Sequence, residues 1–409
     1  MIRLLVKLTL PDSTTLFCGE IVTTLPDSRG MIQGAFRYAP EYLKHPLAFP
    51  LDPVNLPLRS KEFRTNRPEG VHAVFEDALP DDWGRNLLVK KANLGRGEQT
   101  LPRLLEVLGA NGLGALSFQS KQNRPEPEDS SSDIKNLEAL LNAALRYESG
   151  LPLDEEDLKL LYQSGSSPGG ARPKALCRKE TGSLWIAKFP RHNDTFHVES
   201  IEAATLELAK LSGLSVPEFE IQDIGSRKAL LVKRFDISDH HGGRYHMISM
   251  QTLLQAQGYY FLSYHDMFDV VKAHSYQPSI DVPALFHQMV FNVAIGNTDD
   301  HLKNFCMLHK ESGYCLSPVY DLLPDLYEKR EHSLSFFPGT GFLPPDRKIL
   351  QRIGEDLNIE MTGQIIDKVL QVVSGWKNIF QQYHVPEFEI QRLEWSINRR
   401  IELLLFNNL

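Results

Sequence analysis

Cysteine is scarce in this sequence. The 409 residues include four cysteines, and no two of them form a CxxC pair. This argues against a disulfide framework and against a cysteine zinc site, so we expect reduced thiols. Long apolar runs are also missing, because no stretch approaches the ~18 uninterrupted apolar residues of a membrane span. The first residues reach Pro11 and Asp12 too early for a signal peptide, and we expect a cytoplasmic protein without a membrane partner.

Positive charge is not in excess either. The formal net charge is -8 at pH 7, so the surface as a whole has no electrostatic reason to bind a phosphate backbone, and direct nucleic-acid binding is disfavoured. What is present is typical of a folded globular chain, with 42% hydrophobic and 23% charged residues. The length exceeds the ~100–200 residues that one core usually organises, which predicts two or more packed units.

A stretch without aliphatic or aromatic residues divides the chain. This segment, 120–133, reads SKQNRPEPEDSSSD and is predicted to be a linker, because it cannot contribute to a core. Before it, the runs RLLVKLTL and LFCGEIVT predict strands, and a helix is expected to begin near Asp81 or Asp82. The run GANGLGALSF fits neither phosphate-loop order of glycines and is predicted to be a turn entering a strand.

The sequence after the linker changes from strand-rich to helix-rich. Two helical segments come first, and the second is predicted to stop at Gly165. The runs ALCRK and LWIAKF, separated by ETGS, then predict a β-hairpin. A helix that ends at Gly213 and the strand-like run ALLVKRFDI follow. Helical patterns dominate from about Thr252 onward, with one interruption near residues 304–320. The order predicts an α+β protein with a β-rich lobe followed by an α-rich lobe.

A polar cluster follows the apolar run that ends at Ile295. It places Asp299, Asp300, His301 and Asn304 within six positions. A solvated turn is one interpretation, because such residues satisfy backbone groups at helix ends. The spacing favours another, since Asp299 and Asn304 match the D-x-x-x-x-N of the kinase catalytic loop, in which the Asp accepts the hydroxyl proton and the Asn holds magnesium. Asp300 has the wrong spacing.

A second hairpin is predicted just after this cluster. The runs FCMLH and YCLSPV are separated by KESG, which puts the centre of the hairpin near Ser312 and Gly313. Asn304 and Asp321 are equally far from that centre, so we expect them to face each other with Cβ atoms ~5 Å apart. Both could then ligate one hard cation through oxygen. Asp299 is thus the predicted catalytic base, with Asn304 and Asp321 as metal ligands.

Positive charge for a triphosphate is expected upstream of this cluster. Lys188 stands among apolar neighbours in LWIAKF. Its amine either reaches an anion or extends to water from an edge strand, and the two interpretations stand equally at this point. Glu202, in the following helix, is a candidate ion-pair partner of Lys188, with Glu199 and Glu207 as rivals. The loop SGSSPGGARPK offers Gly169 and Gly170 for close approach to phosphate and Lys174 for charge, but it lacks the G-K-[ST] of a Walker A loop.

These motifs resemble the HipA family, the serine/threonine-kinase toxins of bacterial HipBA-type toxin–antitoxin modules. The chain carries GGARPKAL, WIAKFP, LLVKRFD, GNTDDHLKNF and LSPVYDLLP in the family's order, and its segments GAFRYAPEYLKHPLAFPLDPVNLPL and VFEDALPDDWGRNLL look like the family's N-terminal subdomain. The resemblance implies a protein-kinase-like, two-lobed fold with a β-rich N-terminal subdomain and an all-α C-terminal lobe. It implies four segments: a subdomain at 1–119, a linker at 120–133, a kinase N-lobe at 134–245 and a helical C-lobe at 246–409.

The resemblance also implies roles for single residues. Lys188 would contact the ATP phosphates, the backbone near Lys233 and Phe235 would hold the adenine, and His301 is a further candidate for cofactor binding. A serine of the glycine-containing loop is autophosphorylated in the family, and Ser167 matches it by its distance from Lys174. Ser166 and Ser164 are close enough to compete, and all three serines could simply form turns.

The implied function is an ATP- and Mg²⁺-dependent serine/threonine protein kinase that arrests growth. Its partner would be a small DNA-binding, HipB-like antitoxin, so that operator DNA is reached only through the antitoxin. An aminoacyl-tRNA synthetase or another translation component is the expected substrate. The alternatives are a kinase-like, antitoxin-binding co-repressor with little transfer activity, and a small-molecule kinase of the aminoglycoside type.

Overall fold

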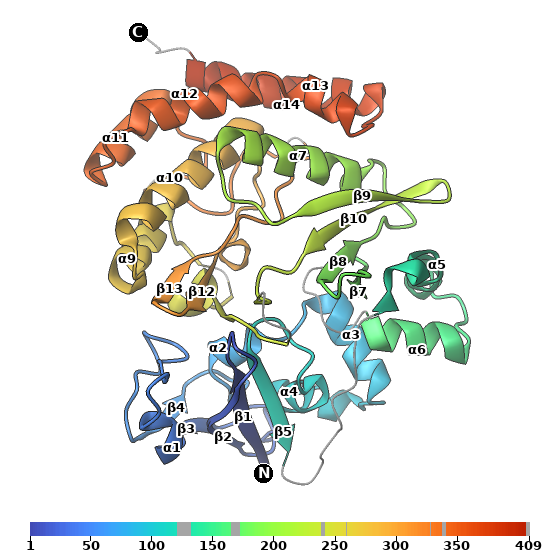
Figure 1. Cartoon of the computed structure of the whole chain (residues 1–409), viewed down its shortest axis with the longest axis vertical. Helices are drawn as coiled ribbons and strands as arrows, with labels where there is room; N and C mark the ends of the chain where they lie inside the picture. The colour runs from blue at the N-terminus through green and yellow to red at the C-terminus, as the bar shows by residue number, and fades with distance from the viewer. Residues whose placement is uncertain are drawn as a thin grey trace. The chain divides into compact units, whose positions relative to one another are not determined.

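The computed structural model describes residues 1–120, 132–164, 172–238, 242–258, 260–327, 329–337 and 341–405. The chain forms two compact units, and Figure 1 follows its path from blue to red. The first unit comprises Met1–His192, Val232–Gln255 and Leu308–Glu311; the second comprises Asn193–Leu231, Ala256–Met307 and Ser312–Leu409. Each unit is thus made of several separate segments, and the linear four-part division expected from the sequence stays a prediction.

The first unit begins with a five-stranded antiparallel sheet in the order β4-β3-β2-β1-β5. Its strands are β1 (Ile2–Thr9), β2 (Thr15–Thr23), β3 (Gly34–Tyr38), β4 (Glu62–Thr65) and β5 (Leu116–Ser120). Side chains alternate along β1, where Leu4, Val6 and Leu8 are at most 1% exposed and belong to the core. The two N-terminal strand predictions are therefore confirmed.

Short helices accompany this sheet. They are α1 (Pro40–Leu43), α2 (Ala73–Glu76), α3 (Asp82–Lys91), the 3-10 turn η1 (Arg96–Glu98) and α4 (Leu101–Leu108). α3 begins where the sequence predicted, with Asp81 as its N-cap residue. Along α4, leucines recur at helical spacing and are buried on the side that contacts β1 and β5.

The glycine-containing run before β5 is a turn, as predicted. Gly114 has a φ of +70°, and its N–H donates to Oδ2 of Asp236 (2.7 Å). The buried guanidinium of Arg234 binds both carboxylate oxygens of Asp236 and also donates to the carbonyl oxygen of Gly112 (3.1 Å). The glycines therefore allow the backbone to approach a buried ion pair, and this role accounts for them without a phosphate.

The rest of the first unit contains the predicted helices and the first predicted hairpin. Its elements are β6 (Ser132–Asp133), the turn η2 (Ile134–Asn136), α5 (Leu137–Glu148), α6 (Glu155–Ser164), β7 (Lys174–Arg178), β8 (Leu184–Lys188), β11 (His246–Ser249) and α8 (Met250–Leu253). β7 pairs with β8 antiparallel, which confirms the hairpin of ALCRK and LWIAKF. Gly165, the predicted stop of α6, lies outside the described residues.

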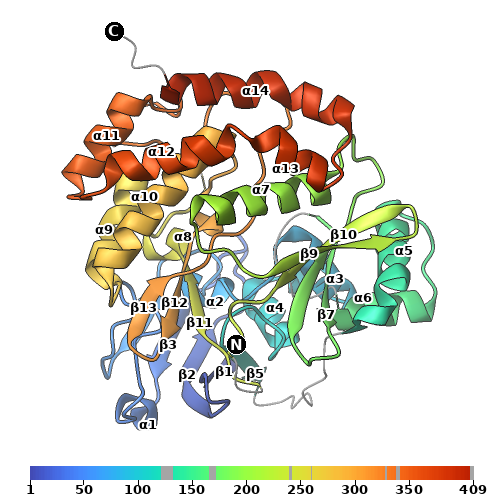
Figure 2. The same cartoon turned by 45° about the horizontal axis from the view of Figure 1, so that its top comes forward.

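The second unit is mainly helical. It contains α7 (Val198–Ser212), β9 (Phe219–Ile224), β10 (Arg227–Lys233, which ends in the first unit), α9 (Tyr264–His274), α10 (Pro278–Ile295), η3 (Leu302–Asn304), β12 (Cys306–Lys310, which continues into the first unit from Leu308), β13 (Gly313–Leu316), α11 (Arg347–Asp356), α12 (Thr362–Val373), α13 (Trp376–Gln382) and α14 (Glu387–Leu405). α7 ends at Gly213 with a φ of +104°, as predicted. Figures 1 and 2 show α12 and α14 side by side, with α12 and α13 against α7.

Helix α10 is the core helix of this unit. From Leu285 to Ile295 all its residues are buried except His287, so the helix is apolar on nearly every side. Strands and helices together confirm the α+β class. Among the described helices, none is long and apolar enough to cross a membrane.

Candidate active site

The polar cluster lies in the loop 297–304, called the Asp299 loop, which follows α10. The helix ends at Ile295, and Gly296 then takes a φ of +81°, a conformation that favours glycine. A Cβ atom on Gly296 would also lie 2.7 Å from Nε of Arg400, so a larger residue would displace this arginine. The glycine therefore allows the chain to turn out of α10 beneath Arg400.

Burial distinguishes the two neighbouring aspartates of this loop. From Phe291 to Asp300 every residue is buried except Asp299, whose side chain is 73% exposed. Asp300, in contrast, is 0% exposed. A general base must come within hydrogen-bond reach of the substrate hydroxyl, and only the exposed carboxylate is accessible. Burial and spacing thus both favour Asp299 as the base.

Asp300 accepts hydrogen bonds from three groups. Tyr264 Oη donates to its Oδ2 (2.7 Å), His332 Nδ1 lies 2.9 Å from the same oxygen, and the Ser333 N–H donates to Oδ1 (2.7 Å). Ser333 also donates to the carbonyl oxygen of Thr298 through its N–H and its hydroxyl. The residues on both sides of the exposed aspartate are therefore anchored.

These contacts fix the tautomer of His332. Its Nε2 lies 3.2 Å from Nη1 of Arg400, which can only donate, so Nε2 accepts and the proton is on Nδ1, which donates to Asp300. Tyr264 accepts from Nδ2 of Asn292 (3.0 Å), and burial raises its pKa well above the ordinary value, so its hydroxyl keeps the proton that it donates. All five side chains are buried. We call these residues, Asn292, Tyr264, Asp300, His332 and Arg400, the Asp300 network.

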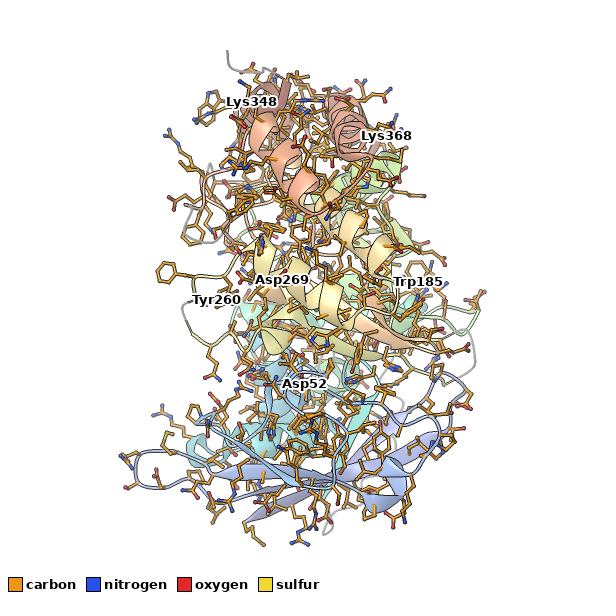
Figure 3. The ribbon with its side chains drawn as sticks, turned by 90° about the vertical axis from the view of Figure 1, so that its left-hand side faces the viewer. Asp52, Trp185, Tyr260, Asp269, Lys348 and Lys368 are labelled. Carbon is orange, nitrogen blue, oxygen red and sulfur yellow. The ribbon has the colours of Figure 1, made fainter. Side chains whose placement is uncertain are left out.

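Asn304 ends the 3-10 turn η3 and turns back toward the loop. Its Nδ2 donates to the carbonyl oxygen of Asp299 (2.7 Å), which directs its Oδ1 away from that backbone. The hydroxyl of Tyr260 accepts from the N–H of Leu302 (3.3 Å) and holds the turn from the segment before α9 (Figure 3). His301 Nε2 lies 4.0 Å from Oδ1 of Asp299. The loop thus brings a carboxylate, an amide and an imidazole together.

The second predicted hairpin is present but shorter than expected. β12 begins at Cys306, β13 ends at Leu316, and the Ser317 N–H donates to the carbonyl oxygen of Cys306 (3.0 Å). The turn η3 and the segment after β13 leave Asn304 and Asp321 beyond the paired strands. These two residues are therefore not partners within the paired strands, and the expectation that they face each other beyond the open end of the hairpin stays a prediction.

A side-chain bond joins the same two segments instead. Tyr320 Oη donates to the carbonyl oxygen of Lys303 (2.7 Å) and lies 2.7 Å from Sγ of Cys306. Tyr320 directly precedes Asp321, and Lys303 directly precedes Asn304. The hydrogen bond between Tyr320 and Lys303 therefore joins the residues that directly precede the two candidate metal ligands, Asp321 and Asn304.

The backbone of Asp321 is unusual. Its φ is +51°, in the left-handed region that few residues other than glycine adopt, and its side chain is half-buried. Aspartate tolerates this region better than most residues, but the conformation still has an energetic cost. Such conformations cluster at ligand and catalytic sites, which is consistent with a functional carboxylate here.

The candidate metal ligands are oxygen donors. Mg²⁺ prefers oxygen and usually takes one or two carboxylates together with waters and substrate phosphates. Asn304 Oδ1 and the Asp321 carboxylate fit this preference. No group of three or more His, Cys, Asp and Glu side chains suited to hold a metal ion occurs within the described residues. A cation here would therefore depend on the phosphates as well as on these two residues.

Two lysines of the first unit lie opposite each other. Lys174 in β7 pairs in register with Lys188 in β8, and Lys174 is 5% exposed while Lys188 is half-buried. Two like charges directly opposite on neighbouring strands destabilise a sheet, and burial of an ammonium adds to that cost. The hairpin therefore brings both predicted phosphate lysines to one place, and their contact with a phosphate stays a prediction.

The remaining predicted residues are placed as follows. Lys233 is the last residue of β10, and Phe235 follows it half-buried in the first unit. Glu202 is 8% exposed in α7 of the second unit, whereas Lys188 belongs to the first, so their ion pair stays a prediction. Four predicted residues lie outside the described part of the chain: Ser166, Ser167, Gly169 and Gly170.

Sequence reasoning missed the residues that hold the Asp299 loop. Tyr264, His332 and Arg400 are far from the cluster along the chain, and none stands in a recognisable motif. Tyr320 does lie within the motif LSPVYDLLP, directly before Asp321. Its position directly before a candidate metal ligand was the one feature of the sequence that could have pointed to a residue holding the loop.

Comparison with known proteins identifies the family. The chain matches the HipA N-terminal domain over residues 16–119 and the HipA-like C-terminal domain over residues 166–376. It is 28% identical over 328 residues to a candidate kinase of Sinorhizobium fredii, covering 72% of this chain and 74% of the relative. It is 26% identical over 330 residues to the serine/threonine-protein kinase toxin HipA of Shewanella oneidensis, covering 72% of each.

A solved structure extends this similarity to the whole fold. In the toxin–antitoxin complex of Shewanella oneidensis MR-1 that contains HipA, HipB and operator DNA, one chain matches this one with a TM-score of 0.69 and 20% identity, covering 97% of this chain and 96% of that chain. The match confirms the predicted kinase-like α+β fold. The C-terminal family model alone spans more than half of the 409 residues. The chain therefore belongs to the HipA family of kinases.

Proposed function

We propose that this chain is an ATP- and Mg²⁺-dependent serine/threonine protein kinase that acts as the toxin of a toxin–antitoxin pair. The observation that carries the proposal is the exposed carboxylate of Asp299, held in an otherwise buried segment with Asn304 five residues later. In phosphoryl transfer the protein mainly positions the reacting groups and compensates the negative charge of the phosphates. The Asp300 network supplies the positioning of this carboxylate.

In the proposed reaction, Asp299 accepts the proton of a serine or threonine hydroxyl while that oxygen attacks the γ-phosphorus. The bond from the γ-phosphorus to the bridging oxygen breaks, and ADP leaves. Asn304 and Asp321 would hold Mg²⁺, which when bound neutralises charge on the phosphate oxygens. Lys174 and Lys188 would neutralise the remaining phosphate charge, and the backbone near Lys233 would hold the adenine.

The proposed partner is a small DNA-binding antitoxin. Support comes from the whole-chain similarity to a HipA chain solved together with HipB and operator DNA. The net charge of -8 favours contact with DNA through such a partner over direct binding. For the substrate, we propose a translation component such as an aminoacyl-tRNA synthetase, a choice that depends on the family resemblance alone.

The test of the kinase proposal uses ATP labelled at the γ-phosphate. Label transferred to serine or threonine of a protein, including the chain itself, supports the proposal. Nucleotide binding without transfer would favour the co-repressor, and transfer only to small hydroxyl compounds would favour a small-molecule kinase. A phosphoproteome recorded after brief expression in bacteria then identifies the substrate.

Asp321→Ala tests the metal site. A lost carboxylate oxygen should weaken the cation and misalign the phosphates, so transfer should fall at every ATP concentration. The measurement is the initial rate against Mg²⁺ at saturating ATP. Partial recovery at high Mg²⁺ supports a ligand, whereas an unchanged rate at low Mg²⁺ excludes it. Asp325→Ala is the control, because Asp325 also lies in the segment after β13, but its carboxylate accepts a hydrogen bond from the N–H of Lys329.

Autophosphorylation is tested by mass spectrometry after incubation with ATP and Mg²⁺. We expect a phosphate on Ser167 or Ser166 of the wild type and none on Asp299→Asn. A phosphate adds ~1.5–2 negative charges near the proposed ATP lysines, so Ser167→Asp should bind ATP poorly while Ser167→Ala binds it normally. An unmodified loop in an active kinase would refute this regulation and leave the kinase proposal intact.

A further inference from the structure

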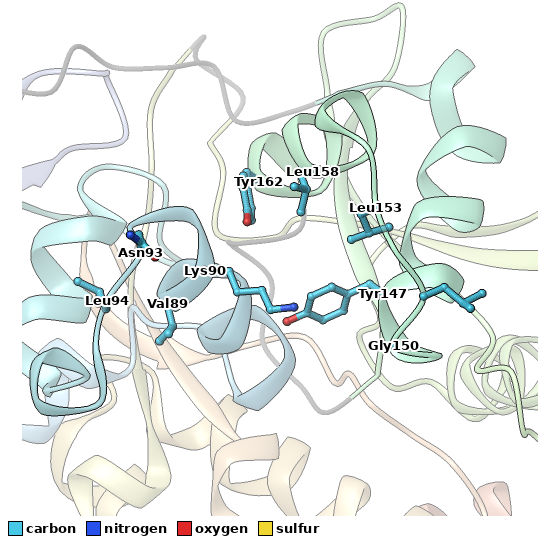
Figure 4. A pocket seen from close by; sticks show the side chains of 10 residues that line it. Val89, Lys90, Asn93, Leu94, Tyr147, Gly150, Leu153, Leu158 and Tyr162 are labelled. Carbon is cyan, nitrogen blue, oxygen red and sulfur yellow. The ribbon is translucent and has the colours of Figure 1, made fainter.

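A pocket in the first unit lies apart from every residue assigned so far. It is formed by the C-terminal end of α3 with the turn after it, the end of α5 with the turn after it, and α6 (Figure 4). Its volume is about 430 Å³, within the ~300–1,000 Å³ typical of small-ligand sites. Each of its ten lining residues belongs to the first unit.

Part of the wall is apolar and incompletely covered. Val89 and Leu94 come from the α3 side, and Leu153 and Leu158 from the α6 side; all four are only half-buried. Burying such side chains against a ligand is favourable by roughly 25 cal/mol per Å² of apolar surface removed from water. The pocket can therefore hold an apolar body about the size of an aromatic ring.

The polar part of the pocket is positively charged. Lys90 carries the one formal charge among the ten lining residues, all of which the structure describes. Its Nζ lies 4.3 Å from the ring centroid of Tyr147, and Figure 4 shows the amine directed to that ring across the pocket. The ring holds the ammonium in place by a cation–π contact but does not neutralise it. A negative ligand group would do so.

We propose that this pocket binds a small amphipathic carboxylate. Its apolar body, an aromatic or branched aliphatic group, packs against the leucines and Val89, and its carboxylate pairs with Lys90. Lys90 is exposed, so a neutral ligand would gain nothing from its charge, whereas a cationic ligand would be repelled by it. Charge and shape together thus select an anion with an apolar body. This site is independent of the proposed kinase chemistry.

The test compares 4-phenylbutanoate with the neutral 4-phenylbutanamide on the full chain. The two probes share size and apolar body and differ in charge. We expect the carboxylate to bind about tenfold more tightly, as a charge-assisted bond allows. Isothermal titration calorimetry gives both dissociation constants, which for probes of this size should be of millimolar order.

Three variants locate the binding. Lys90→Met keeps the stem but removes the charge, so the preference for the carboxylate should disappear. Lys91→Met, on the same helix but outside the pocket lining, should keep the preference. Leu158→Trp fills the pocket and should weaken both probes at least tenfold, with circular dichroism to check folding.

Several outcomes overturn the proposal. They are absence of saturable binding at millimolar concentration, equal binding of both probes to the wild type, or an unchanged preference in Lys90→Met. Wild-type affinity in a folded Leu158→Trp protein would show that the probe binds elsewhere and would equally overturn it.

Discussion

Asp299→Asn should lower phosphoryl transfer by about 10²–10⁴-fold while folding and ATP affinity stay unchanged. An amide cannot accept the hydroxyl proton, and loss of a general base typically has an effect of this size. The side chain is 73% exposed, and Asn304 bonds the backbone carbonyl of residue 299, a contact that survives the substitution. The rate of label transfer from γ-labelled ATP measures the effect, and growth arrest in bacteria should disappear with it.

Asp300→Asn serves as the matched comparison for this variant. If Asp299→Asn transfers phosphate as fast as the wild type while Asp300→Asn is inactive, the base has been assigned to the wrong carboxylate. ATP affinity is measured in parallel for both variants. A loss of nucleotide binding in Asp299→Asn would point to a metal or phosphate role for this residue instead of proton transfer.

Asp300→Ala should destabilise the protein by about 3–5 kcal/mol, because removing one member of a buried charged network leaves its partners without compensation. Tyr264 loses its acceptor, the proton on His332 Nδ1 loses its partner, and the Ser333 N–H keeps only the Thr298 carbonyl. All of this happens at a position that is 0% exposed. The shift of the urea unfolding midpoint, followed by circular dichroism and tryptophan fluorescence, measures the loss.

Two further variants at positions 299 and 300 distinguish an effect on stability from an effect on the reaction. Asp300→Asn keeps the volume and one carbonyl acceptor, so its loss should be smaller, about 1–3 kcal/mol. Asp299→Ala removes an exposed side chain and should change stability by no more than about 0.5 kcal/mol. If Asp300→Ala unfolds at the wild-type midpoint, the Asp300 network does not anchor the loop, and the positioning argument fails.

Much of the fold was predictable because its signals are local. Alternation along β1, the turn ETGS between β7 and β8, and the glycine after α7 each determine one element within about ten residues. The spacing of Asp299 and Asn304 is local in the same sense, and it is carried by the turn η3.

The sequence was less informative about contacts between residues that are far apart along the chain. Asn304 and Asp321 were expected to face each other because they are equally far from the centre of the hairpin, but the paired strands end before both residues, and η3 takes the chain out of the ladder. The bond from Tyr320 to the Lys303 carbonyl, which joins the segments instead, has no periodicity that a sequence reveals. The same holds for the other members of the Asp300 network, which come from α9, α10, α14 and an irregular segment.

The position of Arg400 in α14 means that one contact of the Asp299 loop can form only late in translation. A ribosome that adds about 5–20 residues per second makes Asp299 several seconds before it makes Arg400. During that interval the nascent chain carries the whole motif from Asp299 to Asn304, but His332 lacks the arginine that selects its tautomer and Gly296 lacks the side chain packed against it. The contacts that hold the Asp299 loop are therefore complete only late in translation. A chain interrupted before α14 would carry the exposed carboxylate of Asp299 without the Arg400 contacts.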